Sequence, residues 1–126
     1  MTVAATPITE SNLTAAQHLL WLGQKLAPES PLYNMAFLFT LSGEIQPAHF
    51  QAAFQALIER SDVLRMVIEE MDGVPQRRVL PQLNYEVLVL DFSDRETPQA
   101  EAQTWAENRS QKLFNLSERL FETVLI

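Results

Sequence analysis

The pattern of apolar positions along the chain predicts three helices. In residues 15–26, 47–60 and 98–112, apolar side chains recur at spacings of three and four, which places them on one helix face. Pro47 and Pro98 suit the first turn of the second and third helices, where a missing amide hydrogen is tolerated. The second helix has an uninterrupted apolar stripe, which we expect to face the core. The stripe consists of Phe50, Ala53, Phe54, Leu57 and Ile58.

The stretches between these helices predict strands. Residues 36–41 are apolar with almost no polar break, which is typical of a strand covered on both faces. Residues 64–80 alternate and turn at an Asp-Gly pair, so they predict a β-hairpin. Residues 85–90 and 120–126 have the composition of two further strands. Because helices alternate with strands, the sequence predicts an α/β fold arranged as an α+β two-layer sandwich.

The two ends of the chain differ from this regular pattern. Residues 1–12 are polar and without periodicity, so we predict a flexible lead-in before a fold that begins at residue 13. The strand pattern of residues 120–126 stops without a turn or a polar tail. Since an apolar strand normally leads into a turn or a connection, we expect the sequence to be a truncated piece of a larger protein.

Composition and charge limit the class of function. A length of 126 residues is typical of one domain, and 16 acidic against 9 basic residues give a net charge of -7. This charge repels phosphate backbones and anionic headgroups, so we expect neither nucleic acid nor a membrane surface as partner. The absence of cysteine excludes disulfides and thiolate chemistry. Residues 1–24 contain neither lysine nor arginine and resemble no targeting segment, so a cytoplasmic location is expected.

The sequence offers few residues for catalysis or ligand binding. Gly23, Gly43 and Gly73 stand far apart, so no loop for phosphate binding is present, and the G-x-S-x-G motif of serine hydrolases is also missing. His18 and His49 lie on different predicted helices, and neither has a carboxylate at ligand spacing. We therefore assign no catalytic, cofactor-binding or metal-ligating residue to this chain.

Three residues are candidates for the structural support of a site. Arg65 lies in the middle of a predicted strand, where a charge requires a carboxylate or carbonyl partner, and we favour a structural role over a catalytic one. Gln17 and Trp21, four residues apart, share a helix flank. They could touch a substrate channel, but we favour packing against the first predicted strand. In the third helix, we expect Trp105 to pack inward and Arg109 to reach the edge.

Two longer stretches match known motifs. Residues 14–22, TAAQHLLWL, resemble S-x-A-Q-x-R-x-W-x-L, the opening motif of nonribosomal peptide synthetase condensation domains, and Tyr33-Asn34 follows as in that family. Residues 60–68, RSDVLRMVI, are similar to the family's second motif, R-H-E-x-L-R-T-x-F. Shorter matches occur at residues 73–76, 91–93 and 113–116. The departures from the two motifs are Thr14, Leu19, Ser61, Asp62, Met66 and Ile68.

The resemblance implies a chloramphenicol acetyltransferase-like fold in which two lobes meet over a tunnel. Residues 13–126 would form most of the N-terminal lobe. Members of the family join a carrier-bound acyl or peptidyl thioester to the amine of a carrier-bound aminoacyl thioester. Phosphopantetheine arms of carrier domains deliver both substrates, so the implied partners are carrier domains, the remaining lobe and the adjacent synthetase modules. The catalytic motif H-H-x-x-x-D-G is absent here and would lie beyond Ile126.

The resemblance also implies roles for the candidate residues. Arg65 would brace the active-site loop of the full domain from its own strand, and Gln17 and Trp21 would support the site. Because no general base is found, we expect residues 1–126 alone to be inactive. Two alternatives stay open: an ester-forming or carrier-independent acyltransferase of the same fold, and a noncatalytic half-domain that docks carrier domains.

Overall fold

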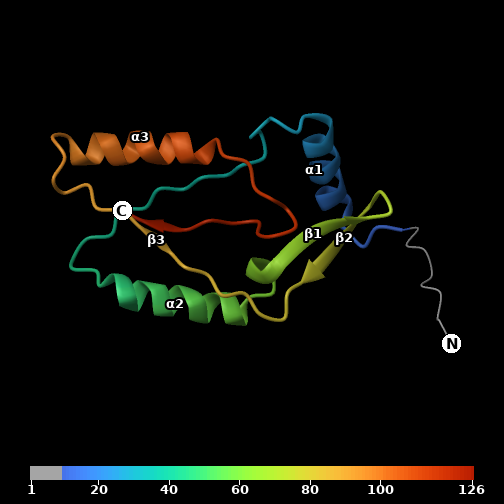
Figure 1. Ribbon diagram of the computed structural model, residues 1–126, viewed down its shortest axis with the longest axis horizontal. Coiled ribbons are helices and arrows are strands. Elements are labelled where there is room, and N and C mark those ends of the chain that lie inside the picture. Colours follow the sequence, from blue (N-terminus) through green and yellow to red (C-terminus); the bar gives the residue numbers. More distant parts are fainter. Residues whose placement is uncertain (1–9) are drawn as a thin grey trace.

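The structure of the chain is a computed structural model that describes residues 10–126. Figure 1 shows α1 beside a hairpin at one end of the molecule and the other helices with a second, smaller strand pair at the other end. The hairpin strands β1 and β2 pair antiparallel, whereas β3 and β4 pair parallel. The elements are α1 (Ala15–Leu26), α2 (Pro47–Arg60), the 3-10 turn η1 (Val63–Arg65), β1 (Met66–Met71), β2 (Val74–Val79), β3 (Leu88–Val89), α3 (Pro98–Ser110) and β4 (Val124–Leu125). The predicted mixed α/β class is confirmed.

The core lies where α2 packs on the segment leading into β3. Ile58, Tyr85 and Val87 are its buried members. The partly buried side chains around them are Phe50, Phe54, Leu64, Leu83, Phe121 and Leu125. The predicted stripe of α2 is confirmed in part, because Leu57 is exposed while Phe50, Phe54 and Ile58 face this core.

Side-chain amides of α2 replace strand pairing along residues 83–87. Gln55 accepts from the Tyr85 amide at 3.0 Å and donates to the Leu83 carbonyl at 3.0 Å. Gln51 accepts from the Val87 amide and donates to the Tyr85 carbonyl, both at 2.7 Å. A buried backbone group needs such a partner. The predicted strand 85–90 is therefore reduced to the two residues of β3, since the helix supplies the partners for the rest.

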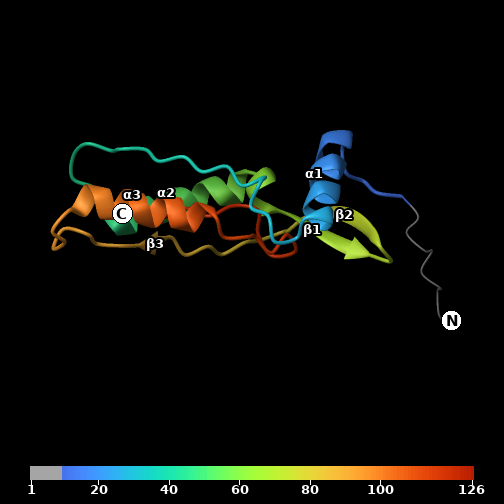
Figure 2. The ribbon, with the colours of Figure 1, turned by 90° about the horizontal axis from the view of Figure 1, so that it is seen from above.

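The prediction of a strand at residues 36–41 covered on both faces is wrong for this structure. The segment is extended but pairs with no strand, and Phe37 and Phe39 are 76% and 79% exposed. In the view of Figure 2, this segment and β3 lie on opposite sides of helices α2 and α3. Its apolar run indicated burial correctly as a tendency, but the described residues contain no element that covers it.

Other predicted boundaries shift by a few residues. The hairpin is confirmed, with a positive φ at Asp72 and Gly73 in its turn. Arg65 lies in η1, directly before the hairpin, and not in the middle of a strand as predicted. The strand predicted at 120–126 is reduced to β4, and α3 ends at Ser110, before the predicted end near residue 112.

Residues 10–12 lie along the free edge of β2. Asn12 donates to the Arg77 carbonyl at 2.9 Å and accepts from the Arg77 amide at 2.6 Å, while Ser11 donates to the Pro75 carbonyl at 2.7 Å. These contacts cover backbone groups that an edge strand would leave open. The rest of the predicted lead-in, residues 1–9, lies outside the described residues, and the domain boundary at residue 12 stays a prediction.

The accessible surface is large for the mass of the chain. It amounts to 9773 Å², whereas a compact monomer of this size exposes about 6,800 Å². Residues 1–9 can add at most about 1,500 Å² to the difference, the value for an unfolded chain of that length. Much of the surplus is therefore exposed apolar surface such as Met35, Phe37 and Phe39. Among residues 10–126, no helix is both long and apolar enough to cross a bilayer.

Candidate functional site

Gln17 serves as a capping residue of α1. Its backbone amide donates to the Thr14 hydroxyl at 3.2 Å, and its side-chain oxygen accepts from the Thr14 amide at 3.0 Å. This reciprocal capping box satisfies two amides at the start of the helix. The side-chain nitrogen faces the Met66 sulfur at 4.0 Å. Gln17 therefore contacts β1, and not the first predicted strand at 36–41, because that segment forms no strand.

Trp21 lies half-buried on the same flank of α1. The ammonium of Lys25 stands 5.5 Å from the centre of the indole ring, and the ring of His18 meets it edge-on at 5.8 Å. Lys25 also forms an ion pair with Glu70 of the hairpin. The indole is thus held between a cation and an imidazole, an arrangement that stabilises the position of α1 on the hairpin.

Arg65 joins the C-terminal end of α2 to the far end of β2. Its guanidinium donates to the carbonyls of Ile58 at 3.2 Å, Leu80 at 2.7 Å and Pro81 at 3.2 Å. It also pairs with Asp62 at 2.7 Å, and its side chain is 14% exposed. The predicted need for carboxylate or carbonyl partners is thus met. This geometry makes Arg65 a brace within the chain, and its role toward the active-site loop stays a prediction.

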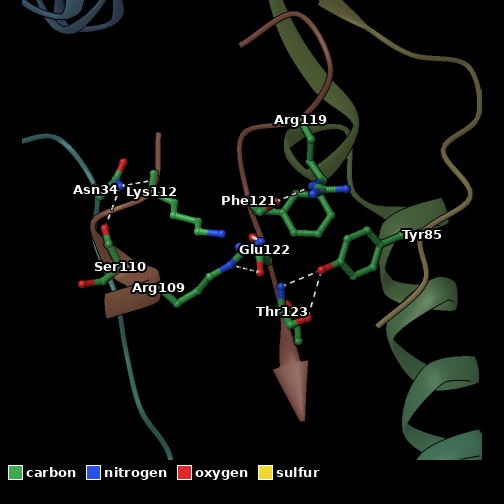
Figure 3. Close-up of polar contacts among 9 residues, drawn as sticks. All are labelled: Asn34, Tyr85, Arg109, Ser110, Lys112, Arg119, Phe121, Glu122 and Thr123. Carbon is green, nitrogen blue, oxygen red and sulfur yellow. Dashed lines mark hydrogen bonds and ion pairs between the residues drawn. The ribbon is translucent and has the colours of Figure 1, made fainter. Parts of the chain in front are cut away.

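A second group of polar residues lies between α3 and β4 (Figure 3). Arg109 donates two hydrogen bonds to the Glu122 carboxylate, each 2.7 Å long. The side chains are 33% and 18% exposed. The hydrogen bond to Glu122 raises the pKa of Arg109 above its ordinary value. Two parallel bonds fix both distance and orientation, so this pair sets how α3 lies against β4.

The Tyr85 hydroxyl closes the junction between β3 and β4. It donates to the Thr123 carbonyl at 2.9 Å and accepts from the Thr123 amide at 2.8 Å (Figure 3). The guanidinium of Arg119 lies 5.0 Å from the centre of the Tyr85 ring and donates to the Phe121 carbonyl at 2.8 Å. These contacts hold the segment before β4 in register with the segment before β3.

An open groove of about 1230 Å³ lies beside this polar group. Its walls come from residues 35–41, from α3 and from residues 122–126. Arg109 and Glu122 are the charged pair in the wall, and Phe37, Phe39 and Leu113 are among its apolar members. Within residues 10–126, no group of three metal-ligating side chains is found. The described residues thus form a framework with apolar walls and paired charges.

The structure does not bring the predicted site residues into one cluster. Gln17 and Trp21 lie on α1, whereas Arg65 lies at the end of α2. Sequence reasoning missed Glu122 as the partner of Arg109. A signal was present, because Glu122 is a single carboxylate in the apolar run 120–126, and a charge in a strand requires a partner.

The fold and these contacts describe an α/β framework with no evident catalytic group among residues 10–126. The family model described as Condensation domain matches residues 8–126. The chain therefore belongs to the condensation-domain family.

Curated relatives agree with this assignment. One of the subunits that make up the linear gramicidin synthase of Brevibacillus parabrevis is 34% identical over 99 residues, which cover 76% of this chain and 1% of that protein. The dimodular nonribosomal peptide synthase of Bacillus subtilis (strain 168) is 32% identical over 95 residues, covering 75% of this chain and 4% of the relative. The chain thus spans a very small part of the relatives it matches.

Solved structures show the same fold. The starter condensation domain of rhizomide synthetase RzmA superposes with a TM-score of 0.78 at 36% identity, covering 85% of this chain and 27% of that chain. The first condensation domain of the calcium-dependent antibiotic synthetase, solved with a substrate analogue, also gives a TM-score of 0.78 at 24% identity, covering 89% of this chain and 28% of that chain. The second likeness concerns the fold alone. The predicted N-terminal part of a condensation-domain fold is confirmed.

Proposed function

We propose that residues 13–126 are the N-terminal part of a condensation domain that forms an amide bond. In this proposal, the complete domain joins a carrier-bound acyl or peptidyl thioester to the amine of a carrier-bound aminoacyl thioester. The observation that carries the proposal is the family match over residues 8–126. The large apolar surface supports it, since an isolated soluble domain rarely exposes so much.

The chemistry indicates that the rest of the domain is needed. Amide formation from a thioester requires a group that deprotonates or positions the amine, and donors that stabilise the developing oxyanion. The charged groups of the groove wall, Arg109 and Glu122, are engaged with each other. We therefore infer that residues 1–126 alone are inactive and that they supply the framework of one lobe.

The same proposal names the partners. Carrier domains would present substrates on phosphopantetheine arms, and this chain itself would bind no cofactor. The remaining lobe would cover the apolar residues of segment 36–41, which expose most of their side-chain surface. Adjacent synthetase modules would provide the carriers. The relatives named above support this, because both are peptide synthetases.

The test compares two proteins in one assay. The first is the chain of residues 1–126, and the second is its natural polypeptide, continued through an H-H-x-x-x-D-G motif. Each is mixed with a donor carrier and an aminoacyl carrier, and the carrier-bound product is followed by mass spectrometry. We expect product with the second protein only. Turnover by residues 1–126, or a natural polypeptide without that motif, would overturn the proposal.

The choice of substrates separates the alternatives. A C8 acyl thioester belongs among the donors, because a variant of the rhizomide starter domain was solved in complex with C8-CoA. A hydroxyl acceptor tests an ester-forming enzyme, and a donor on free coenzyme A tests a carrier-independent one. Binding of carriers without any turnover by the complete polypeptide would instead favour the noncatalytic docking function.

A further inference from the structure

The connection between α1 and segment 36–41 passes the C-terminal end of α3 (Figure 1). Two neighbouring residues of this connection, Tyr33 and Asn34, contact different helices. A Cβ atom placed on Gly23 of α1 would lie 2.1 Å from the Tyr33 hydroxyl and 2.8 Å from two ring carbons. The ring of Tyr33 therefore lies directly against the backbone of α1, where only glycine leaves it room.

Asn34 makes the contact with the other helix. Its side-chain nitrogen donates to the carbonyls of Ser110 and Lys112, each at 2.7 Å (Figure 3). Carbonyls in the last turn of a helix have no partner within the helix. An amide nitrogen carries two hydrogens, so Asn34 satisfies two of these groups with one side chain. Aspartate has the same shape but offers only acceptors at neutral pH.

The rest of the connection is held to α1. Gln24 donates to the carbonyls of Ala27, Pro28 and Ser30, at distances of 3.3, 3.2 and 3.1 Å. Two prolines restrict the backbone between Gln24 and Tyr33. The connection is therefore anchored at both ends. Among residues 10–126, no hydrogen bond or ion pair joins α1 directly to α3.

We propose that the Tyr33–Asn34 pair is the joint that sets the position of α1 relative to α3. Asn34 is thus a positioning residue, which acts on Gln17 and Trp21 through α1. The joint transmits in both directions, because a coupling free energy between two sites is reciprocal. A change at Asn34 affects the C-terminal turn of α1, and a change at Gly23 affects the C-terminal turn of α3.

Hydrogen exchange on the natural polypeptide that contains this sequence tests the joint. Asn34→Ala removes both hydrogen bonds to α3. We expect exchange to rise at residues 110–112 and also, about tenfold, at the amides of residues 23–27, where tenfold corresponds to about 1.4 kcal/mol. Gly23→Ala displaces the Tyr33 ring, and we expect faster exchange at residues 110–112. Asn34→Asp should reproduce Asn34→Ala, since it cannot donate.

A matched control is Gln55→Ala, which also removes a side-chain amide with two backbone partners, Leu83 and Tyr85. We expect this variant to leave exchange at residues 23–27 unchanged. If Asn34→Ala changes residues 110–112 alone, Asn34 is only a helix cap and the joint is refuted. If Gln55→Ala accelerates residues 23–27 equally, the effect is global and the joint is again refuted. Hydrogen exchange needs no catalysis, so its outcome is independent of the proposed function.

Discussion

Replacement of Arg65 by alanine tests the brace between α2 and the hairpin. The guanidinium donates to three backbone carbonyls, those of Ile58, Leu80 and Pro81. Each such bond contributes about 1 kcal/mol net, and the mostly buried stem adds roughly another 1 kcal/mol. We therefore expect Arg65→Ala to lower the free energy of unfolding by about 3 kcal/mol. Asp62 is 78% exposed, so Asp62→Ala should cost less than about 1 kcal/mol.

The assay is urea unfolding of the natural polypeptide, followed by intrinsic fluorescence, together with the rate of condensation. Arg65→Lys is the matched variant, because lysine keeps the charge but lacks the planar fork of five donors. We expect its midpoint to lie between wild type and Arg65→Ala. An unchanged midpoint and rate for Arg65→Ala would refute the brace. Equal losses for Asp62→Ala and Arg65→Ala would show that the ion pair, and not the carbonyl contacts, carries the effect.

Three further changes test single contacts. Tyr85→Phe leaves the amide and carbonyl of Thr123 without their partner, and we expect a loss of about 1–3 kcal/mol in urea unfolding. Gly73→Ala places a side chain at a φ of 79° with no atom within 4 Å, so strain alone should cost about 1 kcal/mol by the same measurement. Arg78 holds the pKa of the Glu69 carboxyl below its usual range, and Arg78→Ala should return that pKa upward in an NMR titration. Because the folded pKa is lowered, the pair stabilises the fold above the ordinary glutamate pKa, and this contribution is lost as pH falls through the lowered value.

The sequence predicted the elements whose signals are local. Helix α2 begins at Pro47 as expected, because the first-turn proline and the apolar stripe act within the same residues. The hairpin turn at Asp72 and Gly73 is equally local. The extended segment 36–41 was predicted wrongly, since an apolar run indicates a tendency to be buried but does not identify the element that covers it. Periodicity contains no information about that partner.

The candidate site was predictable in its chemistry but not in its pairings. Arg65 was expected to need a carboxylate or carbonyl, and it has both. The Arg109–Glu122 pair spans the connection between α3 and β4, so neither helical nor strand spacing relates the two residues. The double contact of Asn34 with α3 spans 76 residues and more. Long-range partners of this kind follow from the packing of elements, which local patterns do not determine.

Polar and apolar groups of the described residues are satisfied to different degrees. Among residues 10–126, every buried side-chain nitrogen and oxygen has a hydrogen-bond partner. Apolar groups, in contrast, stay exposed on segment 36–41, where Phe37 and Phe39 stack at 6.2 Å. For the proposed complete domain, the remaining lobe therefore has to supply apolar side chains over this segment and backbone partners for its edges. Burial of these aromatic side chains would recover about 25 cal/mol for each Å² of apolar surface. The framework would then be stabilised chiefly by the lobe that completes it, which is why we expect activity and full stability to appear together.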